Sequence, residues 1–562
     1  MNALAYMSTP KGDRRRLPAV YPHRRAVLAS HPHRVVSLVS LSRRIPDEFI
    51  AQILAEALCR ESSRSVLLIQ CVQSEGSLTL RDWRTLYPGL NGEFGLATQI
   101  KTGRGRAPFL RLEFSDPAED PAGLANLIEH CRQHFDYILL NIGMAVPPTI
   151  LTEALLHADL AYLLVEPTAE NFYNRDLLLR ELRARSRDEN IQPYMIVCRE
   201  GGEERGNDLL KALGPAVHGF IHGCPDATSG PPVPPWSDKH FNADIRRLAR
   251  EIARRRIGLA LSSGGARSLA HIGVIQVLEE NGIEVDVVAG CSMGAYVGSV
   301  WAYGLGGIEM ERLAREVENR WGILQLIDPF ILPRQGFLRG EKVKRRLKNS
   351  IGDVHFSELV RPLRVVATNL NTLERTVFSS GEVATAVHAS SAIPGACAPV
   401  KIDDELYIDG GISDPLPVDV LEEMGIERII AVNTIPTAAY LRMRFEIDRE
   451  QAALRGKKPS RFKAFVQQYL NYFAPGNILD TILRSFHGAQ MRVAEDSCLH
   501  ADLVLRPLSF DGRWHDFRHP GKYIALGRRE AEEHLDDIKA LVSRKEPEYE
   551  YAPAQQSMAT AT

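Results

Sequence analysis

The segment 257–294 constrains the fold of this 562-residue chain more than any other part of it. It reads IGLALSSGGARSLAHIGVIQVLEENGIEVDVVAGCSMG. An apolar run over 257–261 predicts a strand, and a loop of small residues separates that strand from a predicted helix over 267–280. A second apolar run, 285–289, leads directly into a serine between two glycines. The segment therefore contains two strand-to-helix junctions close together, which is typical of α/β folds.

The second junction, Gly290-Cys291-Ser292-Met293-Gly294, fits the G-x-S-x-G pattern of a nucleophile elbow. In such an elbow the serine occupies a sharp turn, and side chains at the flanking positions would collide with the strand or the helix. Gly290 and Gly294 suit those positions, and a helix-compatible stretch follows at 295–303. The pattern predicts that Ser292 is a nucleophile. Small residues also cluster in ordinary turns, which is the alternative for this pentapeptide alone.

The first junction contains Gly264, Gly265 and Ala266, directly before the predicted helix. A serine that attacks an ester creates an oxyanion, which needs preorganised hydrogen-bond donors. Backbone N–H groups at a glycine-rich helix N-terminus supply such donors, and the helix dipole adds to their effect. We therefore expect these three residues to form an oxyanion hole. Arg267 either orients the loop or caps the helix surface.

A dinucleotide-binding turn is the alternative for the same loop, because it also joins a strand, a glycine-rich loop and a helix. Ser263 and Ser268 stand where the outer glycines of G-x-G-x-x-G are required, and only Gly265 fits. The nucleotide interpretation of this loop is therefore weak. His271 falls inside the predicted helix and is interpreted as a packed side chain rather than a general base.

The serine needs a base, and Asp409-Gly410-Gly411 contains the best candidate. Asp409 ends a short apolar run over 406–408, so a strand would carry its carboxylate to an edge of the sheet. An Asp-Gly pair also forms common hairpin turns. Taken alone, this tripeptide is therefore better explained as a turn.

Together, these motifs resemble the patatin-like phospholipase family over about 257–417. The matching segments, in chain order, are Gly264-Gly265-Ala266-Arg267, Ala270-His271-Ile272-Gly273-Val274, Gly290-Cys291-Ser292-Met293-Gly294, Ser391-Ala392-Ile393-Pro394-Gly395 and Asp409-Gly410-Gly411. The resemblance implies a three-layer α/β/α hydrolase domain in which a Ser–Asp dyad hydrolyses lipid acyl esters without a catalytic histidine or a cofactor.

By this resemblance Ser292 is the nucleophile, Asp409 is the base, and the backbone of 264–266 is the oxyanion hole. Arg267, Gly290, Gly294, Gly410 and Gly411 support these motifs. Ser263 and Ser268 depart from the family, which usually has glycine at both positions. Their presence leaves the detailed shape of the oxyanion loop open.

The first half of the chain alternates apolar runs with helical patterns, which predicts a mostly parallel α/β sheet. The predicted strands are 35–41, 65–70, 137–142, 160–165 and 194–197, and the predicted helices are 46–59, 122–134 and 174–185.

Two stretches of this half, 135–141 and 158–167, resemble strands of ParA/MinD-like P-loop ATPases. A phosphate cradle needs G-x-x-x-x-G-K-[ST] after the first strand. This chain has Ser42-Arg43-Arg44-Ile45-Pro46 there, and Asn141 stands where the resemblance expects aspartate. We therefore expect a degenerate, Rossmann-like module that hydrolyses no nucleotide. A structural spacer is an equally good alternative.

The predicted organisation has five parts. They are a disordered basic arm over 1–33, the degenerate NTPase-like domain over 34–225, a Pro-rich linker and basic helix over 226–256, the patatin-like domain over 257–543 and a disordered tail over 544–562. Arginines at 246–256 indicate either a solvated helix face that packs against acidic neighbours, which we favour, or attraction to anionic lipid. The basic and aromatic stretch 457–473 predicts a helix that is buried against the core or lies in a membrane interface.

Composition sets the remaining expectations. The formal net charge is −2, which does not suggest nucleic acid as a partner, and the eight cysteines form no C-x-x-C pair. No run approaches the ~18 apolar residues of a membrane span, and no secretory signal is evident. We expect a cytoplasmic enzyme, with peripheral membrane contact left open, that acts on phospholipid or lysophospholipid. No metal cluster is expected.

Two alternatives to the dyad enzyme remain. One is an α/β-hydrolase with a Ser-His-Asp triad, because histidines follow Asp409 at 487, 500, 515 and 519. The other is a catalytically silent regulatory or scaffolding protein, which the degenerate first domain and the two loop serines would suit.

Overall fold

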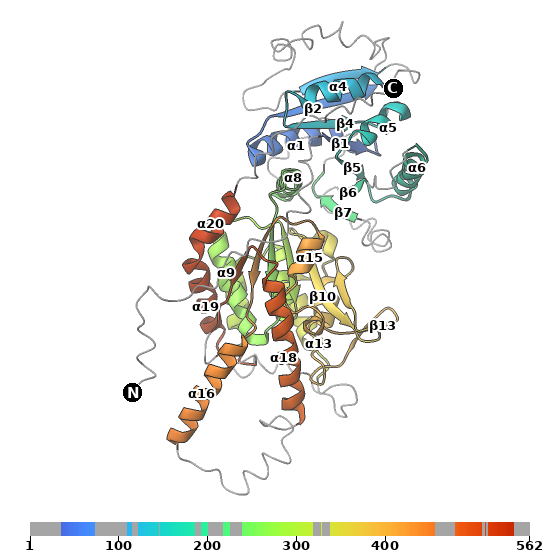
Figure 1. The fold of residues 1–562 in the computed structure, drawn as a ribbon. Helices are drawn as coiled ribbons and strands as arrows, with labels where there is room; N and C mark the ends of the chain where they lie inside the picture. The colour runs from blue at the N-terminus through green and yellow to red at the C-terminus, as the bar shows by residue number, and fades with distance from the viewer. Residues whose placement is uncertain are drawn as a thin grey trace, which may run out of the picture.

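The computed structural model describes most of the chain. The described residues are 35–73, 109–114, 122–144, 146–185, 193–199, 217–224, 239–318, 328, 338–455, 478–508, 512 and 515–544. They form two α/β units, one for each of two sheets (Figure 1). The predicted arm 1–33, the proline-rich stretch 228–235, the basic and aromatic stretch 457–473 and the tail beyond Arg544 lie outside the described residues.

The first sheet has seven parallel strands in the order β3-β2-β4-β1-β5-β6-β7. The strands are β1 (Val35–Ser40), β2 (Val66–Gln73), β3 (Phe109–Phe114), β4 (Tyr137–Ile142), β5 (Leu160–Val165), β6 (Tyr194–Cys198) and β7 (Val217–Ile221). Every residue of β1, β4 and β5 is buried. Central strands of a parallel sheet are covered on both faces, which is why these segments read as continuous apolar runs.

Helices cover both faces of this sheet. Helices α4 (Ala122–Arg132), α5 (Pro148–Leu156) and α6 (Ala169–Arg185) pack on one face, and α1 (Asp47–Ser62) and α8 (Lys239–Ile252) pack on the other. The side chains of β1 alternate between the two cores, with Val35 and Val39 in the first and Val36 and Leu38 in the second. Helix α8 therefore contributes its apolar side to the core of the first sheet.

The second sheet has eight strands, with β12-β13-β10-β9-β8-β14-β15 in order and β11 also paired with β10. The strands are β8 (Ile257–Leu261), β9 (Val287–Cys291), β10 (Leu363–Asn369), β11 (Arg375–Phe378), β12 (Val400–Ile402), β13 (Glu405–Asp409), β14 (Arg428–Val432) and β15 (Leu503–Leu505). Strands β10, β9, β8, β14 and β15 are parallel, whereas β11 and β13 run antiparallel to β10.

Two helical layers enclose the parallel part of this sheet, so the second unit is a three-layer α/β/α domain. One layer holds α9 (Ala270–Glu280), α10 (Met293–Tyr303), α11 (Gly307–Arg315), α13 (Glu341–Ile351), α14 (Val383–Ser390), α19 (Pro520–Glu533) and α20 (Leu535–Ser543). The other holds α15 (Val418–Glu423) and α18 (Ile478–Cys498). Helix α16 (Ala438–Arg455) extends away from the domain (Figure 1).

Several predicted boundaries need correction. The helix expected over 267–280 begins as a 3-10 turn, η8 (Gly265–Leu269), before α9. The strand expected at 285–289 is β9, which starts two residues later, directly after Asp286, whose carboxylate accepts a hydrogen bond from Ile257 N–H at 2.8 Å. At the end of the second unit, His534 (φ −107°, ψ 15°) separates α19 from α20.

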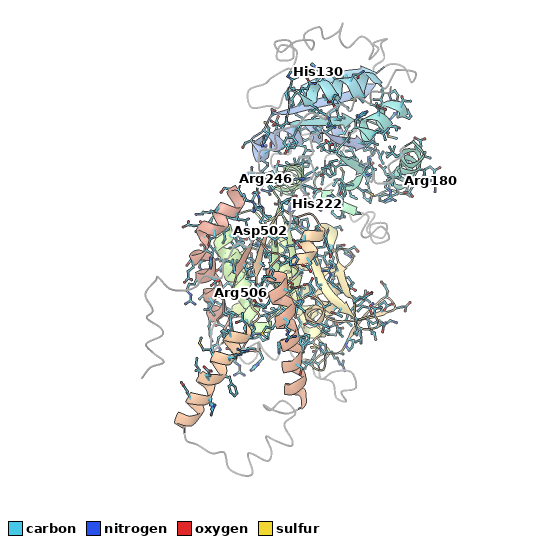
Figure 2. The ribbon with its side chains drawn as sticks, viewed as in Figure 1. His130, Arg180, His222, Arg246, Asp502 and Arg506 are labelled. Carbon is cyan, nitrogen blue, oxygen red and sulfur yellow. The ribbon has the colours of Figure 1, made fainter. Side chains whose placement is uncertain are left out.

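The arginines of 246–256 form contacts within the protein. Arg250 pairs with Glu284 at 2.8 Å and with Asp286 at 2.9 Å, and Arg246 pairs with Glu284 at 2.8 Å. Helix α8 therefore joins the first sheet to acids of the second unit, as Figure 2 shows for Arg246 at the junction. These pairs favour the internal explanation of the basic segment over the lipid-surface one. Among the described helices, none is both long enough and apolar enough to cross a membrane.

Candidate active site

Strand β10 brings the two candidate catalytic residues, Ser292 and Asp409, together. It pairs with β9 on one side, where Val366 lies opposite Cys291, and with β13 on the other, where Ala367 lies opposite Asp409. Ser292 is the residue after β9, and Asp409 is the last residue of β13. Neighbouring positions on β10 thus place the serine and the carboxylate beside each other.

Ser292 occupies a strained turn. Its backbone has φ 53° and ψ −120°, a region that side chains other than glycine rarely adopt. A Cβ on Gly290 would lie 2.7 Å from Ala295, and a Cβ on Gly294 would overlap the carbonyl oxygens of Leu261 and Ser262. The turn is therefore packed tightly against the end of β8, and only glycine fits on either side of the serine.

The serine hydroxyl contacts the carboxylate directly. Ser292 Oγ donates a hydrogen bond to Asp409 Oδ2 at 2.6 Å, and Gly411 N–H donates to Asp409 Oδ1 at 2.7 Å. Burial raises the pKa of Asp409 to about 6, against the lowering effect of these two hydrogen bonds. A carboxylate with a raised pKa is a stronger base once it is ionised, which suits it to accept the proton of the serine.

Ser390, at the end of α14, was not identified from the sequence. Its Oγ donates to the carbonyl of Val366 at 2.6 Å and accepts a hydrogen bond from Ser292 N–H at 2.8 Å. The neighbouring Ala392 carbonyl accepts a hydrogen bond from Asp409 N–H at 2.9 Å. The segment after α14 therefore fixes the backbone of both candidate residues. The Ser391–Gly395 motif begins one residue too late to have indicated Ser390.

The glycine loop adopts a defined shape around Thr434. The Thr434 hydroxyl lies 3.0 Å from the hydroxyls of Ser262 and Ser268, and a Cβ on Gly264 would overlap it. Ser263 N–H donates to the Pro415 carbonyl at 2.8 Å. Ser263 therefore has no spare backbone donor. Ser268 sits in a buried hydroxyl cluster.

The backbone amides of Gly264 and Gly265 lie between the end of β8 and the start of η8. In the described part of the chain, neither amide donates to a backbone or side-chain acceptor outside that helical turn. Donors left free at a helix N-terminus can bind an anion. The expectation of an oxyanion hole at 264–266 remains a prediction.

Arg267 and His271 flank the loop. Arg267 is buried, and its Nε donates to the Gly264 carbonyl at 3.4 Å, which favours the loop-orienting interpretation over a helix-surface cap. His271 is fully buried, and its Nε2 lies 2.9 Å from the Ser262 carbonyl. Burial lowers the pKa of His271 to about 4, so this histidine is neutral near pH 7 and braces the end of β8.

Two of the histidines that could complete a triad have other partners. His500 Nδ1 is hydrogen bonded to Glu422 at 2.9 Å, and His519 Nδ1 to Asp516 at 2.8 Å. Within the described residues, no histidine is hydrogen bonded to Ser292 or Asp409. The geometry around Asp409 therefore favours the dyad over the Ser-His-Asp alternative.

In the described part of the chain, one group of side chains has the spacing of metal ligands. The ligand atoms of Asp419, Glu422 and His500 all lie within 4.8 Å of one another. Acidic groups near the surface often lie together without a metal. The expectation of a reaction that needs no metal stays a prediction.

The strand ends of the first sheet carry a different set of polar groups. Asn141, at the end of β4, donates to Asp47 Oδ2 at 3.0 Å. Glu166, after β5, accepts a hydrogen bond from Ser42 and pairs with Arg44 at 3.3 Å. These groups therefore bind one another at the edge where a P-loop ATPase would hold phosphate.

Comparisons with known proteins identify the second unit. The three-layer fold and the serine on its strained elbow are typical of α/β hydrolase domains. Residues 259–422 match the family described as Patatin-like phospholipase.

The similar curated proteins share this region. An uncharacterized NTE family protein of Mycobacterium tuberculosis is 43% identical over 178 residues, which cover 32% of this chain and 49% of that protein. Lysophospholipase NTE1 of Cryptococcus neoformans is 31% identical over 200 residues, which cover 35% of this chain and 12% of that protein. The matched region thus spans about half the length of the mycobacterial relatives and much less of the fungal ones.

The similarity of the chain to solved structures is low both in sequence identity and in TM-score. A ParA family ATPase from Chlorobium tepidum has a TM-score of 0.28 at 18% identity and covers 40% of this chain and 93% of its own. VipD from Legionella pneumophila has a TM-score of 0.26 at 16% identity and covers 50% of this chain and 67% of its own.

Proposed function

We propose that this protein is a serine lipid acyl hydrolase of the phospholipase or lysophospholipase type. One observation carries the proposal: the hydroxyl of Ser292, on a strained elbow, donates to the buried carboxylate of Asp409 at 2.6 Å. The match of 259–422 to the patatin-like phospholipases supports the substrate class. Nucleophile, base and oxyanion donors are the parts that acyl transfer requires.

Acylation begins when Ser292 Oγ attacks the ester carbonyl carbon. The hydroxyl proton passes to Asp409 Oδ2, and the carbonyl oxygen becomes an oxyanion that faces the N–H groups of 264–266. When the carbon–oxygen bond of the ester breaks, Asp409 returns the proton to the leaving alcohol. An acyl-enzyme at Ser292 and a free alcohol remain.

Deacylation repeats these steps with water. Asp409 accepts a proton from the water as its oxygen attacks the acyl carbon, and the second oxyanion occupies the same donors. Collapse of this intermediate releases a carboxylic acid and returns the proton to Ser292 Oγ. Asp409 thus serves in turn as base and acid, for which a pKa of about 6 is well placed near neutral pH.

The surroundings of the site support access to a lipid surface. Gln490 of α18 lies against Gly411 and Ser263, and α16 begins a few residues after Thr434. Both helices therefore lead away from the edge of the site (Figure 1). Helix α16 exposes large apolar side chains in its first half, namely Leu441, Met443 and Phe445. Such side chains can enter the interface of a bilayer.

Labelling with a fluorophosphonate probe tests the proposal directly. The wild-type protein should be labelled covalently, whereas Ser292→Ala should not be labelled. Ser350→Ala is the matched control, because Ser350 lies on α13 and its hydroxyl only bonds the Arg346 carbonyl. Labelling of folded Ser292→Ala at the wild-type rate would remove Ser292 as the nucleophile. Absence of labelling in every protein would favour the catalytically silent alternative.

A further inference from the structure

A cavity of about 590 Å³ lies between the two units, away from the candidate active site. Strands β6 and β7 and helix α8 line one side, and the first residues of β9 and β10 line the other. Figure 2 shows one lining residue, His222, at this junction. Ser292 follows the opposite end of β9, so the cavity and the serine lie at opposite ends of the same strand. A volume of this size can hold a small organic molecule.

The charges that line this cavity are not balanced. Four arginines, Arg175, Arg247, Arg256 and Arg364, face three carboxylates, Asp244, Glu251 and Glu423. Each carboxylate already has a cationic partner: Asp244 pairs with Arg247 at 2.6 Å, Glu251 with Arg256 at 2.9 Å and Glu423 with Arg375 at 2.5 Å. The cavity therefore has no spare negative charge among its described lining residues.

Arg175 pairs with Asp176 at 2.6 Å, so Arg364 is the lining arginine that has no carboxylate partner among the described residues. Its one described hydrogen bond runs from Nη1 to the carbonyl of Leu363 at 3.0 Å, and no described carboxylate lies within ion-pair distance. Burial, and then repulsion from Arg256, lower the pKa of Arg364 to about 10, so the guanidinium is still charged at neutral pH. Deep in the protein, Arg364 keeps part of its surface accessible, and that surface lines the cavity.

A cation held inside a protein without a counter-charge is unfavourable, because burial removes its hydration. Such side chains are kept most often where a ligand completes their interactions. A guanidinium group offers a planar pair of N–H donors, which match the two oxygens of a carboxylate or a phosphate. The remaining walls include apolar side chains from both units, among them Leu179, Met195, Phe220, Val287 and Phe356.

We propose that this cavity binds a small amphiphilic ligand whose oxyanion head pairs with Arg364 and whose apolar body lies against the surrounding side chains. Two sources share this chemistry. One is a carboxylic acid with an acyl chain, and the other is a phosphomonoester with an apolar or aromatic body. The site is separate from the proposed reaction at Ser292, so it does not depend on that function.

Calorimetric titration of the full chain tests the site, with octanoate and phenyl phosphate as probes for the two sources. We expect the wild-type protein to bind one of them with a Kd of about 1 mM or below. Arg364→Gln should weaken that binding at least about ten-fold, because the charge-assisted pair is lost. Arg529→Gln is the matched control, because Arg529 lies on α19 with its side chain 66% exposed, and it should bind as the wild type does.

A second variant tests the same site without changing the charge. Ser380 lines the cavity, and Ser380→Trp should fill part of it and weaken binding while Arg364 stays in place. This variant also covers the case in which Arg364→Gln fails to fold. If neither probe binds the wild-type protein at millimolar concentration, or if folded Arg364→Gln or Ser380→Trp binds as tightly as the wild type, the proposed site is wrong. Because binding is measured without turnover, these results are independent of whether Ser292 is a nucleophile.

Discussion

The carboxyl ends of the central strands differ between the two sheets. In the first sheet, Asn141 donates to Asp47, and Glu166 contacts Ser42 and Arg44. These polar groups are largely satisfied by one another. In the second sheet, the residue after β9 has a strained backbone, and its hydroxyl faces a buried carboxylate with a raised pKa.

The comparison shows that the parallel α/β architecture alone does not predict chemistry. Both sheets place polar side chains at the edge where α/β proteins bind ligands. In the first sheet the amide of Asn141 offsets the buried carboxylate of Asp47, whose pKa burial raises. In the second, burial keeps Asp409 basic, and tight packing holds Ser292 in an unfavourable conformation. Strain and a raised pKa distinguish a candidate active site from a stable strand end.

Ser292→Ala should have the largest effect. Without the hydroxyl no acyl-enzyme can form, and we expect esterase activity to fall by about 10⁴-fold or more. The measurement is hydrolysis of a short-chain ester by the purified variant, with circular dichroism to show that it is folded. Substantial residual hydrolysis by a folded variant would contradict the nucleophile assignment and remove the main difference between the two sheets.

Asp409→Asn should be nearly as damaging, because asparagine keeps the shape but cannot accept the proton. We expect a loss of ~10²–10⁴-fold in kcat/KM. For the wild-type protein, kcat/KM should rise with pH through about 6 and then level off, because only ionised Asp409 is a base. A rate that is independent of pH across this window would argue against Asp409 as the base.

Asp409→Asn should raise the stability of the protein although it lowers the activity. The pKa of folded Asp409 is about 6, above its usual value of 3.8, so the stability that this group contributes is present at low pH and is lost as pH rises through about 6. Asparagine does not ionise. Relative to the wild type, Asp409→Asn should therefore gain Tm at pH 8 and gain much less at pH 4. Equal shifts at the two pH values would mean that burial does not perturb this carboxyl group.

Much of the first sheet could be predicted from the sequence, and its two missed strands have a common cause. The apolar runs 137–142 and 160–165 coincide with β4 and β5, which lie inside the first sheet. The two missed strands, β3 and β7, are its edges. An edge strand has a neighbour on one side only, and β7 (VHGFI) is mostly half-buried, so its sequence has no continuous apolar run.

The missed site residues depend on long-range contacts. Ser390 lies 98 residues from Ser292, and its role follows from the position of α14 beside β10. Arg364 matters because the two units leave a cavity around it. Motifs indicated Ser292 and Asp409 as candidates because the pattern of a strand followed by a turn is local in the sequence. No local pattern marks a hydroxyl or a guanidinium whose partners come from distant segments.

Ser390→Ala tests how far the orientation of Ser292 depends on its long-range hydrogen bond to Ser390. The substitution removes the acceptor for Ser292 N–H, and a buried donor left without a partner costs ~1–3 kcal/mol. We expect kcat to fall about ten-fold with KM nearly unchanged, since the nucleophile loses its orientation and the substrate contacts remain. Ser390→Thr keeps the hydroxyl and should recover part of the rate. A rise in KM alone would indicate a substrate-binding role instead.

We expect the first unit to be unable to hydrolyse ATP. ATP turnover by the full chain should therefore not exceed that of a buffer blank. The first unit lacks the lysine and glycines of a phosphate loop between Leu41 and Pro46, and its strand-end groups bind one another. Asn141→Asp should destabilise the protein at pH 8 and much less at pH 5, because it puts a second carboxylate beside Asp47. ATP turnover by the wild-type chain that disappears when residues 41–46 are changed would contradict this prediction. It would mean that the strand ends of both sheets support a reaction.

The smallest effect concerns the lipid surface. The arginines of α8 are paired with Glu284 and Asp286, so they should add little to vesicle binding. We expect weak attachment through the apolar side chains of α16, and Phe445→Glu should reduce hydrolysis of vesicle phospholipid two- to three-fold, an order-of-magnitude estimate for one interfacial side chain. Hydrolysis of a soluble short-chain ester should not change, because Phe445 is 68% exposed.

Arg246→Gln is the control, and both variants are measured at low and high salt. If Arg246→Gln reduces vesicle hydrolysis more than Phe445→Glu does, the basic helix contacts lipid, and its pairing with the hydrolase domain is not its main role.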